Sequence, residues 1–282
     1  MWLGGPSSFF SIWREHLFEH LPRWTIDLPT PFDCLIAFGS NLGDEAAILL
    51  DTQQRLRELP GVESLVASDP LRTAPVGGPV GQPDYLNAVF RVQTTFVPVA
   101  LHDALLQIEV DLGRERRVRW GARKLDLDLL LVDQIQLQTD RLTLPHPRMS
   151  FRRFVLQPAR QIAGQMIHPV AELTIAELLD RLNRTPPEII WVTPKNATAQ
   201  KCRDEILELP VMTSSTATPW QIKLVDTLEE FVAASSTAKF VAWSLQRPVE
   251  LATCRFQGPQ LNLPSDPTKV VIELRAAIAA MS

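Results

Sequence analysis

An apolar segment that carries two carboxylates, residues 125–132, constrains the fold of this chain more than any other feature. Asp126 and Asp128 are separated by one leucine, and three further leucines and a valine follow them. Successive side chains of a strand point to opposite faces, so both carboxylates share one face, roughly 6.5–7 Å apart. Two like charges this close are costly unless a cation lies between them. The segment therefore predicts a strand with one apolar face and one face that attracts a cation.

The residues just before this strand, 114–124, include five arginines and one lysine. A guanidinium group matches the oxygens of a phosphate, and Mg²⁺ takes oxygen ligands that it usually shares with substrate phosphates. The two adjacent features predict a site for a metal–polyphosphate. Two simpler explanations compete with it, because an aspartate can block a sheet edge and a basic run can be a solvated loop. Their adjacency, in a chain whose net charge is only -4, favours the phosphate site.

The composition limits the class of protein. The 282 residues allow one large or two ordinary domains, and 45% hydrophobic residues are enough for a core. A net charge of -4 argues against a dedicated nucleic-acid-binding protein, and no apolar run is long enough to span a membrane. The widely spaced Cys34, Cys202 and Cys254 match no metal or redox motif. We therefore expect buried thiols in a reducing compartment, the cytoplasm.

Patterns between residues 35 and 132 predict a mixed α+β core. Strands are expected at 35–38, 62–68, 86–95 and 125–132, and helices from the turn at 39–41 to about 59 and at 98–112. A loop rich in glycine and proline, 74–83, follows the second strand. The order strand–helix–strand–strand–helix–strand is that of a ferredoxin-like fold. A short strand pair before Pro145 and a helix at 173–182 are expected after it.

Residues 1–31 form an N-terminal extension. Phe10, Trp13, Leu17, Leu21 and Trp24 recur at helical spacing, which predicts a docking helix. A secretory signal would need a basic start and an unbroken apolar stretch, and charged residues interrupt this one. Either the extension is a docking helix, or the translated start lies upstream of the true one.

The character of the chain changes after Pro194. Residues 194–219 are expected to be a linker, and residues 220–282 a small α/β appendage. Strands are expected there at 221–225, at 240–245 and near 260–263, and helices at 227–234 and 266–281. This part has no phosphate-loop motif, no dinucleotide-binding motif and no clustered His or Cys, so no catalysis is expected there.

The last expected helix carries an apolar stripe, formed by Val270, Val271, Leu274, Ile278 and Met281. A stripe at helical spacing has to be buried. It is expected to pack either on the small C-terminal sheet or on a second chain.

Residues 119–130 read Arg-Trp-Gly-Ala-Arg-Lys-Leu-Asp-Leu-Asp-Leu-Leu, which resembles the signature of the 6-hydroxymethyl-7,8-dihydropterin pyrophosphokinase family. Further motifs occur in the order of that family, among them Ala37-Phe38-Gly39-Ser40-Asn41-Leu42-Gly43-Asp44, Gln82-Pro83-Asp84-Tyr85-Leu86-Asn87-Ala88, Leu144-Pro145-His146-Pro147-Arg148-Met149 and Arg152-Arg153-Phe154-Val155-Leu156-Gln157-Pro158. The resemblance covers about residues 32–192 and implies a pterin pyrophosphokinase domain at 32–193. Members transfer the diphosphate of ATP to the hydroxymethyl group of the pterin in folate biosynthesis.

The resemblance implies catalytic residues in and beside the basic loop. Asp126 and Asp128 are expected to ligate two Mg²⁺ ions at the phosphates of the co-substrate ATP. Arg114 and Arg123 match the family's catalytic arginines and are expected to stabilise the charge that shifts to AMP.

The resemblance also implies binding residues for both substrates. The expected pterin-binding residues are Thr73, Val76, Tyr85, Asn87, Trp120 and Phe154. The expected ATP-binding residues are Glu109, Arg116, Arg117, Arg119, Arg141, Thr143, His146 and Arg152. The loop from 113 to 120 is one residue shorter than in some relatives, so the individual roles of Arg116, Arg117 and Arg119 stay open. Without the order of the motifs, Tyr85 and Phe154 would be interpreted as ordinary core residues.

Two other functions compete with the pyrophosphokinase. A nucleic-acid-binding ferredoxin-like module is disfavoured because the aromatic RNA-recognition motif is absent and the two aspartates would repel a phosphate backbone. A catalytically inactive scaffold is disfavoured because all the matching carboxylates and arginines are present. The expected partners are ATP and 6-hydroxymethyl-7,8-dihydropterin, with no nucleic acid and no membrane. The C-terminal part leaves room for a homodimer or for a partner from the folate pathway.

Overall fold

The computed structural model describes residues 30–76, 79, 81–113, 123–184, 187–208, 220–244, 251, 254 and 256–281. The helix expected within residues 1–31 lies outside this range. Two β-sheets, one antiparallel and one parallel, organise the part from residue 31 onward. The mixture of helices and strands confirms the α+β prediction.

The antiparallel sheet contains the two aspartates. Its strands are β1 (Phe32–Ser40), β2 (Val62–Ala67), β3 (Leu71–Thr73), β4 (Tyr85–Thr94) and β5 (Asp126–Val132). The order is β2-β4-β1-β5, and β3 pairs with β4. Each of these strands lies within a few residues of its expected position, apart from the three-residue β3, which falls just before the expected loop.

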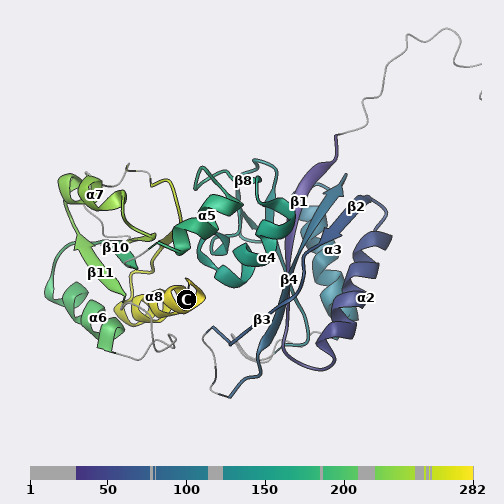
Figure 1. Ribbon diagram of the computed structural model, residues 1–282, viewed down its shortest axis with the longest axis horizontal. Helices are drawn as coiled ribbons and strands as arrows, with labels where there is room; N and C mark the ends of the chain where they lie inside the picture. The colour runs from purple at the N-terminus through teal and green to yellow at the C-terminus, as the bar shows by residue number, and fades with distance from the viewer. Residues whose placement is uncertain are drawn as a thin grey trace, which may run out of the picture. The chain divides into compact units, whose positions relative to one another are not determined.

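Helices cover both faces of this sheet (Figure 1). On one face α2 (Glu45–Glu58) and α3 (Pro98–Asp111) pack against a core that includes Ile36, Phe38 and Phe90. On the other face α4 (Arg153–Ala163) packs against Leu35 and Val89. The side chains of β1 therefore alternate between two cores, as the two-residue period of a strand requires.

Short elements connect the two sheets. They are β6 (Leu137–Gln138), β7 (Thr143–Leu144), the 3₁₀ helix η1 (Met149–Phe151), β8 (Ile167–His168), β9 (Leu173–Thr174) and α5 (Ile175–Leu182). A capping box fixes the start of α5, because Thr174 Oγ1 accepts the Glu177 N–H at 3.1 Å and the Glu177 carboxylate accepts the Thr174 N–H at 2.8 Å. The strand pair before Pro145 and the helix near 173–182 are thus confirmed.

The parallel sheet has the order β11-β10-β12-β13. Its strands are β10 (Glu188–Val192), β11 (Gln221–Val225), β12 (Phe240–Trp243) and β13 (Gln260–Asn262). The helices α6 (Ala197–Glu208) and α8 (Pro267–Met281) join the core on one face, and α7 (Leu228–Ser235) joins the core on the other. Cover on both faces explains why the two central strands, β10 and β12, are almost entirely apolar.

The structure changes the expected division between residues 193 and 220. β10 was expected to belong to the first domain, yet it is a central strand of the parallel sheet. Residues 197–208, expected to be part of a linker, form α6 with Ala199, Cys202 and Ile206 buried. The rest of that expected linker, 209–219, lies outside the described residues. A buried parallel strand has no alternating pattern, so the sequence of β10 could not indicate which sheet it joins.

One core joins the two sheets. Phe151, beside α4, packs edge-to-face against Phe240 of β12 with ring centroids 5.0 Å apart. The apolar stripe of α8 is buried in the same core. It therefore packs within this chain and not on a second chain. Among the described residues, no helix is both long and apolar enough to cross a membrane.

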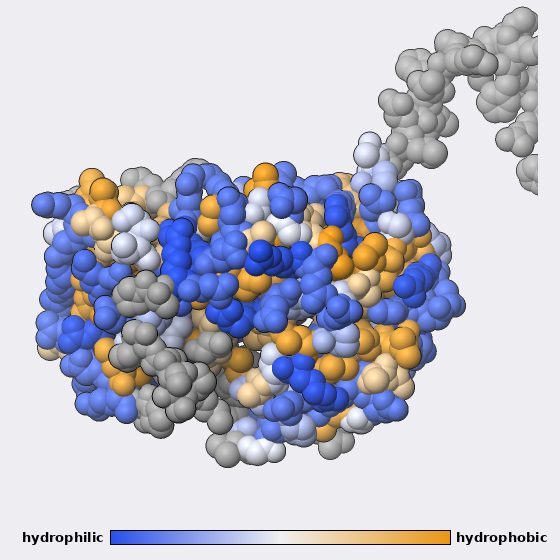
Figure 2. Space-filling model, viewed as in Figure 1, coloured by the Kyte–Doolittle hydropathy of each residue, from blue (hydrophilic) through white to orange (hydrophobic). Residues whose placement is uncertain are grey.

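The surface is mostly hydrophilic on the face shown in Figure 2. Large hydrophobic residues that are exposed, such as Leu50, Val110 and Val232, lie on different helices. Isolated residues of this kind are usual on a soluble surface. The most informative feature is therefore a pocket between the antiparallel sheet and α8.

Candidate active site

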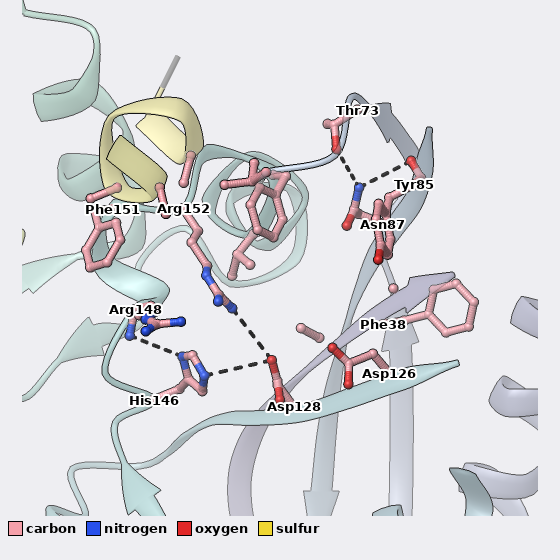
Figure 3. Close-up of a pocket in the computed structure, with 18 of the residues that line it drawn as sticks. Phe38, Thr73, Tyr85, Asn87, Asp126, Asp128, His146, Arg148, Phe151 and Arg152 are labelled. Atoms are coloured by element: carbon pink, nitrogen blue, oxygen red, sulfur yellow. Dashed lines mark hydrogen bonds and ion pairs between the residues drawn. The ribbon is translucent and has the colours of Figure 1, made fainter. Parts of the chain in front are cut away.

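The pocket is lined by residues from β1, β4 and β5, from the segment 146–155 and from α8. Figure 3 shows Asp126 and Asp128 on its floor, with His146, Arg148 and Arg152 on one side and Thr73, Tyr85 and Asn87 on the other. Segments far apart in the sequence thus bring the charged residues and the amide and aromatic residues into one cavity.

The two aspartates lie on β5 opposite small residues. In the register of β1 and β5, Asp126 pairs with Gly39 and Asp128 pairs with Ala37. Cross-strand partners share a face, so these small side chains leave the space above the carboxylates open. The side chains of Asp126 and Asp128 are 25% and 37% exposed, which is enough for a ligand to reach them.

Each carboxylate has an arginine beside it, and Asp128 has a histidine as well. Arg123 Nη1 lies 2.6 Å from Asp126 Oδ2. Arg152 Nη1 lies 3.6 Å from Asp128 Oδ2, and His146 Nε2 lies 3.8 Å from the same oxygen. The shorter contact is a direct ion pair, whereas the two longer ones leave Asp128 accessible to another positive group.

Arg123 is held in place from several directions. Its backbone N–H donates to Asn41 Oδ1 at 2.8 Å, and its guanidinium group is hydrogen-bonded to Asp126 and Tyr85. Burial favours the neutral form of Arg123, but Asp126 and Tyr85 outweigh burial and the pKa is raised. Burial also raises the pKa of Tyr85. Arg123 is therefore a fixed positive charge at the edge of the pocket.

His146 is neutral in this environment. Burial lowers its pKa to about 3, and the nearby charges of Arg152 and Arg148 act in the same direction. The backbone N–H of Arg148 donates to His146 Nδ1 at 3.2 Å. In the neutral ring the proton is then on Nε2, the atom that faces Asp128. His146 thus presents an N–H donor to the pocket.

Arg152 is half-buried and lies over an aromatic ring. Its Cζ is 5.6 Å from the centroid of the Phe154 ring. Burial lowers its pKa, although Asp128 opposes that shift. A guanidinium group remains charged in proteins, so Arg152 supplies a second positive group beside Asp128.

The other side of the pocket is suited to a flat polar ligand. Asn87 Nδ2 donates to Thr73 Oγ1 at 2.9 Å and to the carbonyl oxygens of Leu71 and Tyr85 at 3.3 and 3.4 Å. This orientation fixes which end of the amide is oxygen. Tyr85, Val76 and Phe154 line the same part of the cavity. The interpretation of Tyr85 and Phe154 as core residues is therefore incomplete, because both border the pocket.

Some expected site residues lie elsewhere. Glu109 on α3 is 1% exposed, and its carboxylate accepts the backbone N–H of Leu127 at 2.7 Å. β5 is an edge strand of its sheet, so alternate N–H groups lack a strand partner and one of them is satisfied by Glu109. Arg141 forms an exposed ion pair with Asp103, and Thr143 is part of β7. None of these three residues lines the pocket.

Five expected site residues cannot be placed. Arg114, Arg116, Arg117, Arg119 and Trp120 lie outside the described residues.

The structure adds residues that the sequence did not indicate. Arg148 and Glu273 both line the pocket, and Arg148 Nη2 lies 2.6 Å from Glu273 Oε2. Arg148 belongs to the Leu-Pro-His-Pro-Arg-Met motif, so a signal for it existed. Glu273 is a single acid on an amphipathic helix, and nothing in its sequence context pointed to the pocket.

The side chains of the pocket fit a metal that is shared with a ligand. Among the described residues, no group of three or more His, Cys, Asp or Glu side chains is arranged to hold a metal ion. Asp126 and Asp128 supply two carboxylates on one strand face. Mg²⁺ is commonly bound by one or two carboxylates together with water and substrate phosphates. The donor set therefore suits a magnesium–phosphate group better than an all-protein metal site.

The sequence is similar to that of known enzymes. Residues 35–164 match the family described as 7,8-dihydro-6-hydroxymethylpterin-pyrophosphokinase, HPPK. A Haemophilus influenzae protein named 2-amino-4-hydroxy-6-hydroxymethyldihydropteridine pyrophosphokinase is 39% identical over 144 residues, which cover 51% of this chain and 89% of that protein. The chain belongs to the HPPK family. A Pseudomonas aeruginosa protein of the same name is 39% identical over 160 residues, which cover 54% of this chain and 95% of that protein.

A solved structure is similar to a lower degree. The Plasmodium falciparum HPPK-DHPS A437G structure with pteroate covers 76% of this chain at 11% identity, with a TM-score of 0.41. This chain covers 55% of that longer chain, and a similarity at this level decides nothing about fold or site. The pocket residues of β1, β4, β5 and α4 lie within residues 35–164, the range that matches the HPPK family. The pocket residues of α8 lie beyond that range.

Proposed function

We propose that this HPPK transfers the diphosphate of ATP to 6-hydroxymethyl-7,8-dihydropterin and releases AMP, a step of folate biosynthesis. The observation that carries the proposal is the position of Asp126 and Asp128 between two dissimilar sides of one pocket. One side offers the cations and N–H donors that polyphosphate needs, and the other offers an amide and aromatic rings. Inactive-scaffold and nucleic-acid-binding functions do not account for a pocket divided in this way.

The polyphosphate side holds ATP. Arg152 and Arg123 supply positive charge on either side of the carboxylates, and neutral His146 donates from Nε2. The reaction forms a bond between the hydroxymethyl oxygen and the β-phosphorus, and it breaks the bond from the β-phosphorus to the oxygen bridging to the α-phosphate. AMP leaves with that oxygen and the hydroxyl group loses its proton. Positioned cations stabilise the charge that moves to AMP.

The pterin side orients the acceptor. The amide of Asn87 is fixed by Thr73, so its oxygen can accept from the amino and ring N–H groups of a pterin. Tyr85 and Phe154 supply ring faces for stacking, and Val76 closes the apolar end. Holding the hydroxymethyl group in line with the β-phosphorus is the largest contribution that such residues make.

Asp126 and Asp128 would hold Mg²⁺, and we propose two ions. Bound Mg²⁺ polarises phosphate oxygens and lowers the pKa of a coordinated hydroxyl group. Arg114, Arg116, Arg117, Arg119 and Trp120 are proposed to act at the same phosphates and pterin, with Arg114 as the second catalytic arginine. ATP contacts by Glu109, Arg141 and Thr143 remain predictions from the resemblance.

The remaining expectations are also proposals. The strand order β2-β4-β1-β5, with helices α2 and α3 on one face, supports a ferredoxin-like core. We propose that the pyrophosphokinase module extends from residue 32 to α5, and that the C-terminal α/β part begins at β10 rather than at residue 220. A cytoplasmic location, and a homodimer or a folate-pathway partner, remain predictions, although the buried stripe of α8 no longer calls for a second chain.

A coupled assay tests the function. Purified full-length protein is incubated with ATP and 6-hydroxymethyl-7,8-dihydropterin, and AMP is measured with and without Mg²⁺. We expect one AMP for each pterin diphosphate, with turnover that requires Mg²⁺. Formation of ADP instead of AMP, or no pterin-dependent turnover in a folded protein, would refute the proposal.

A further inference from the structure

The helix α8, from the far end of the chain, lines the same pocket as the aspartates of β5. Its pocket-lining residues are Glu273, Ala276, Ala277 and Ala280. They are spaced i, i+3, i+4 and i+7, which places them on one face of the helix. The neighbouring face, with Leu274 and Ile278, is buried in the core. The position of the pocket-lining face is therefore fixed by packing.

Glu273 is the acidic group on that face and it contacts Arg148. Arg148 Nη2 lies 2.6 Å from Glu273 Oε2, with the two side chains 27% and 15% exposed. The pair is thus partly removed from water, where an ion pair is screened less than on an open surface. The side chain of Arg148 is held on the α8 side of the pocket.

Arg148 in turn orients His146. The Arg148 N–H donates to His146 Nδ1 at 3.2 Å, and His146 Nε2 lies 3.8 Å from Asp128 Oδ2. A chain of contacts therefore runs from Glu273 through Arg148 and His146 to Asp128. Figure 3 shows the last three of these residues side by side. A change at Glu273 can reach the phosphate side without touching a substrate.

We propose that Glu273 is a positioning residue for the nucleotide side of the active site, and that α8 forms one wall of the pocket. Glu273 holds the side chain of Arg148, which fixes the position of that residue, and the backbone N–H of Arg148 keeps His146 directed at Asp128. The three alanines of the same face leave room for the substrates. This inference rests on the proposed function for its kinetic readout, and it makes the C-terminal part a component of the active site.

The first experiment removes the charge of Glu273. Glu273→Gln keeps the volume of the side chain, and Glu229→Gln on the exposed surface of α7 is the matched control. We expect Glu273→Gln to raise the Kd of a non-hydrolysable ATP analogue, measured in the presence of Mg²⁺, about tenfold. The reason is that a small displacement of a side chain that binds the phosphates is costly. The KM for ATP should rise in parallel, while the KM for the pterin and the values of Glu229→Gln stay unchanged.

A double-mutant cycle tests the route through Arg148. If Glu273 acts through Arg148, Glu273→Gln should add less than about a twofold effect in the Arg148→Met background. If Glu273→Gln raised the Kd as much in the Arg148→Met protein as in the wild type, Glu273 would not act through Arg148. A lower Kd in the single variant would overturn the positioning role, because it would mean that the carboxylate merely repels phosphate.

The second experiment tests the wall itself. Ala276 is half-buried and lines the pocket, whereas Ala279 is exposed on the same helix. Leucine has a high helix propensity, so Ala276→Leu and Ala279→Leu differ mainly in where the added volume lies. We expect Ala276→Leu to raise the Kd for the ATP analogue or for the pterin at least about fivefold, and Ala279→Leu to leave both unchanged. Equal Kd values for the two variants, with unchanged thermal stability, would show that α8 does not form a wall of the substrate pocket.

These measurements separate the inference from the function. The binding arm needs no turnover, so it decides the role of Glu273 even if the wild-type protein makes no AMP. Active wild-type protein with unaltered Glu273→Gln binding and KM would overturn the inference and leave the proposed function intact.

Discussion

Cationic side chains have different roles near the antiparallel sheet and near the parallel sheet. At the antiparallel sheet, Arg123 and Arg152 lie beside the carboxylates of Asp126 and Asp128, in a pocket that a ligand can enter. Near the parallel sheet, Arg181 of α5 is buried and donates to the backbone carbonyl oxygens of Ala238 at 3.1 Å, of Ser235 at 3.3 Å and of Gln257. The first arrangement keeps charge for a substrate, and the second uses charge to join segments of the fold.

A lysine just before β12 follows the same rule. Lys239 Nζ donates to the carbonyl oxygen of Leu182, at the end of α5, at 2.7 Å. Burial lowers the pKa of Lys239 to about 8 and that of Arg181 to about 10, so both cations are held at some cost. The comparison teaches that a cation in the sequence does not by itself indicate a ligand. Whether it faces a carboxylate in a pocket or a carbonyl at a helix end decides its role.

The largest expected effect tests the charges of the antiparallel sheet. Asp126→Asn or Asp128→Asn should lower turnover at least about 1000-fold, because each removes a charge that holds the metal–phosphate group. Stability should change little, since the relief of repulsion between the two carboxylates is offset by the loss of the contacts with Arg123 or Arg152. AMP formation and thermal unfolding measure the two effects, with the exposed Asp140→Asn as control. Near-normal turnover at saturating Mg²⁺ would exclude a role for these carboxylates.

The second prediction concerns the junction of the two sheets. Phe240→Ala should reduce the free energy of unfolding by about 3–5 kcal/mol, because it removes a fully buried ring that packs against Phe151. Since both sheets share that core, chemical denaturation should still show one transition. Two separate transitions, with AMP formation lost only in the second, would mean that the sheets fold independently.

The third prediction is a pH dependence of stability. Burial lowers the pKa of His168 to about 4, and its Nδ1 accepts the N–H groups of Ala171 at 3.0 Å and Val170 at 3.3 Å. The unfolded chain binds the proton at higher pH than the native chain, so this contribution is present above pH 6.5 and is lost as the pH falls toward 4. It amounts to at most roughly 3 kcal/mol.

His168→Asn isolates that contribution, because the asparagine oxygen can replace Nδ1 as an acceptor but does not titrate. Denaturation curves of both proteins between pH 7 and 4 give the difference. If the free energy of unfolding fell equally with pH in both proteins, His168 would not cause the pH dependence. The pKa of His146 is lowered too, but His146 is present in both proteins and so cancels in the comparison.

The smallest effect compares two arginines. Arg181→Met leaves buried carbonyl oxygens without their donor and should cost about 1–3 kcal/mol. Arg160→Met removes an exposed ion pair with Asp180 and should cost less than about 1 kcal/mol. Urea midpoints measure both. Equal losses would mean that the carbonyl contacts of Arg181 contribute no more than a surface ion pair.

Much of the fold could be predicted from the sequence because local patterns are strong there. β4 alternates with the two-residue period of a strand, and the apolar stripe of α8 recurs at helical spacing. β10 and α6 are different, because the strand is apolar after Glu188 and the helix follows Pro194 in a segment without clear amphipathicity. Which sheet a buried strand joins depends on distant partners, and no local pattern records them.

The site could be predicted in part for a similar reason. Asp126, Asp128, His146 and Arg152 lie in motifs close to one another, and the pocket brings them together. Glu109 was assigned to ATP from the resemblance, whereas its carboxylate is buried at the backbone of β5. Glu273 could not be found, because its contact with Arg148 depends on how a helix 125 residues away packs.

The buried carboxylate of Glu109 also bears on self-association. Among the described strands β5 lies at the edge of its sheet, and its apolar composition is that of a template for strand addition from another molecule, although the Leu130 carbonyl already accepts the His146 N–H at 2.7 Å. By occupying the N–H of Leu127, Glu109 removes one of the donors that an incoming strand would need. Removing this carboxylate would therefore show first as aggregation of the folded protein. The solubility of the enzyme and the geometry of its active site thus depend on the same strand.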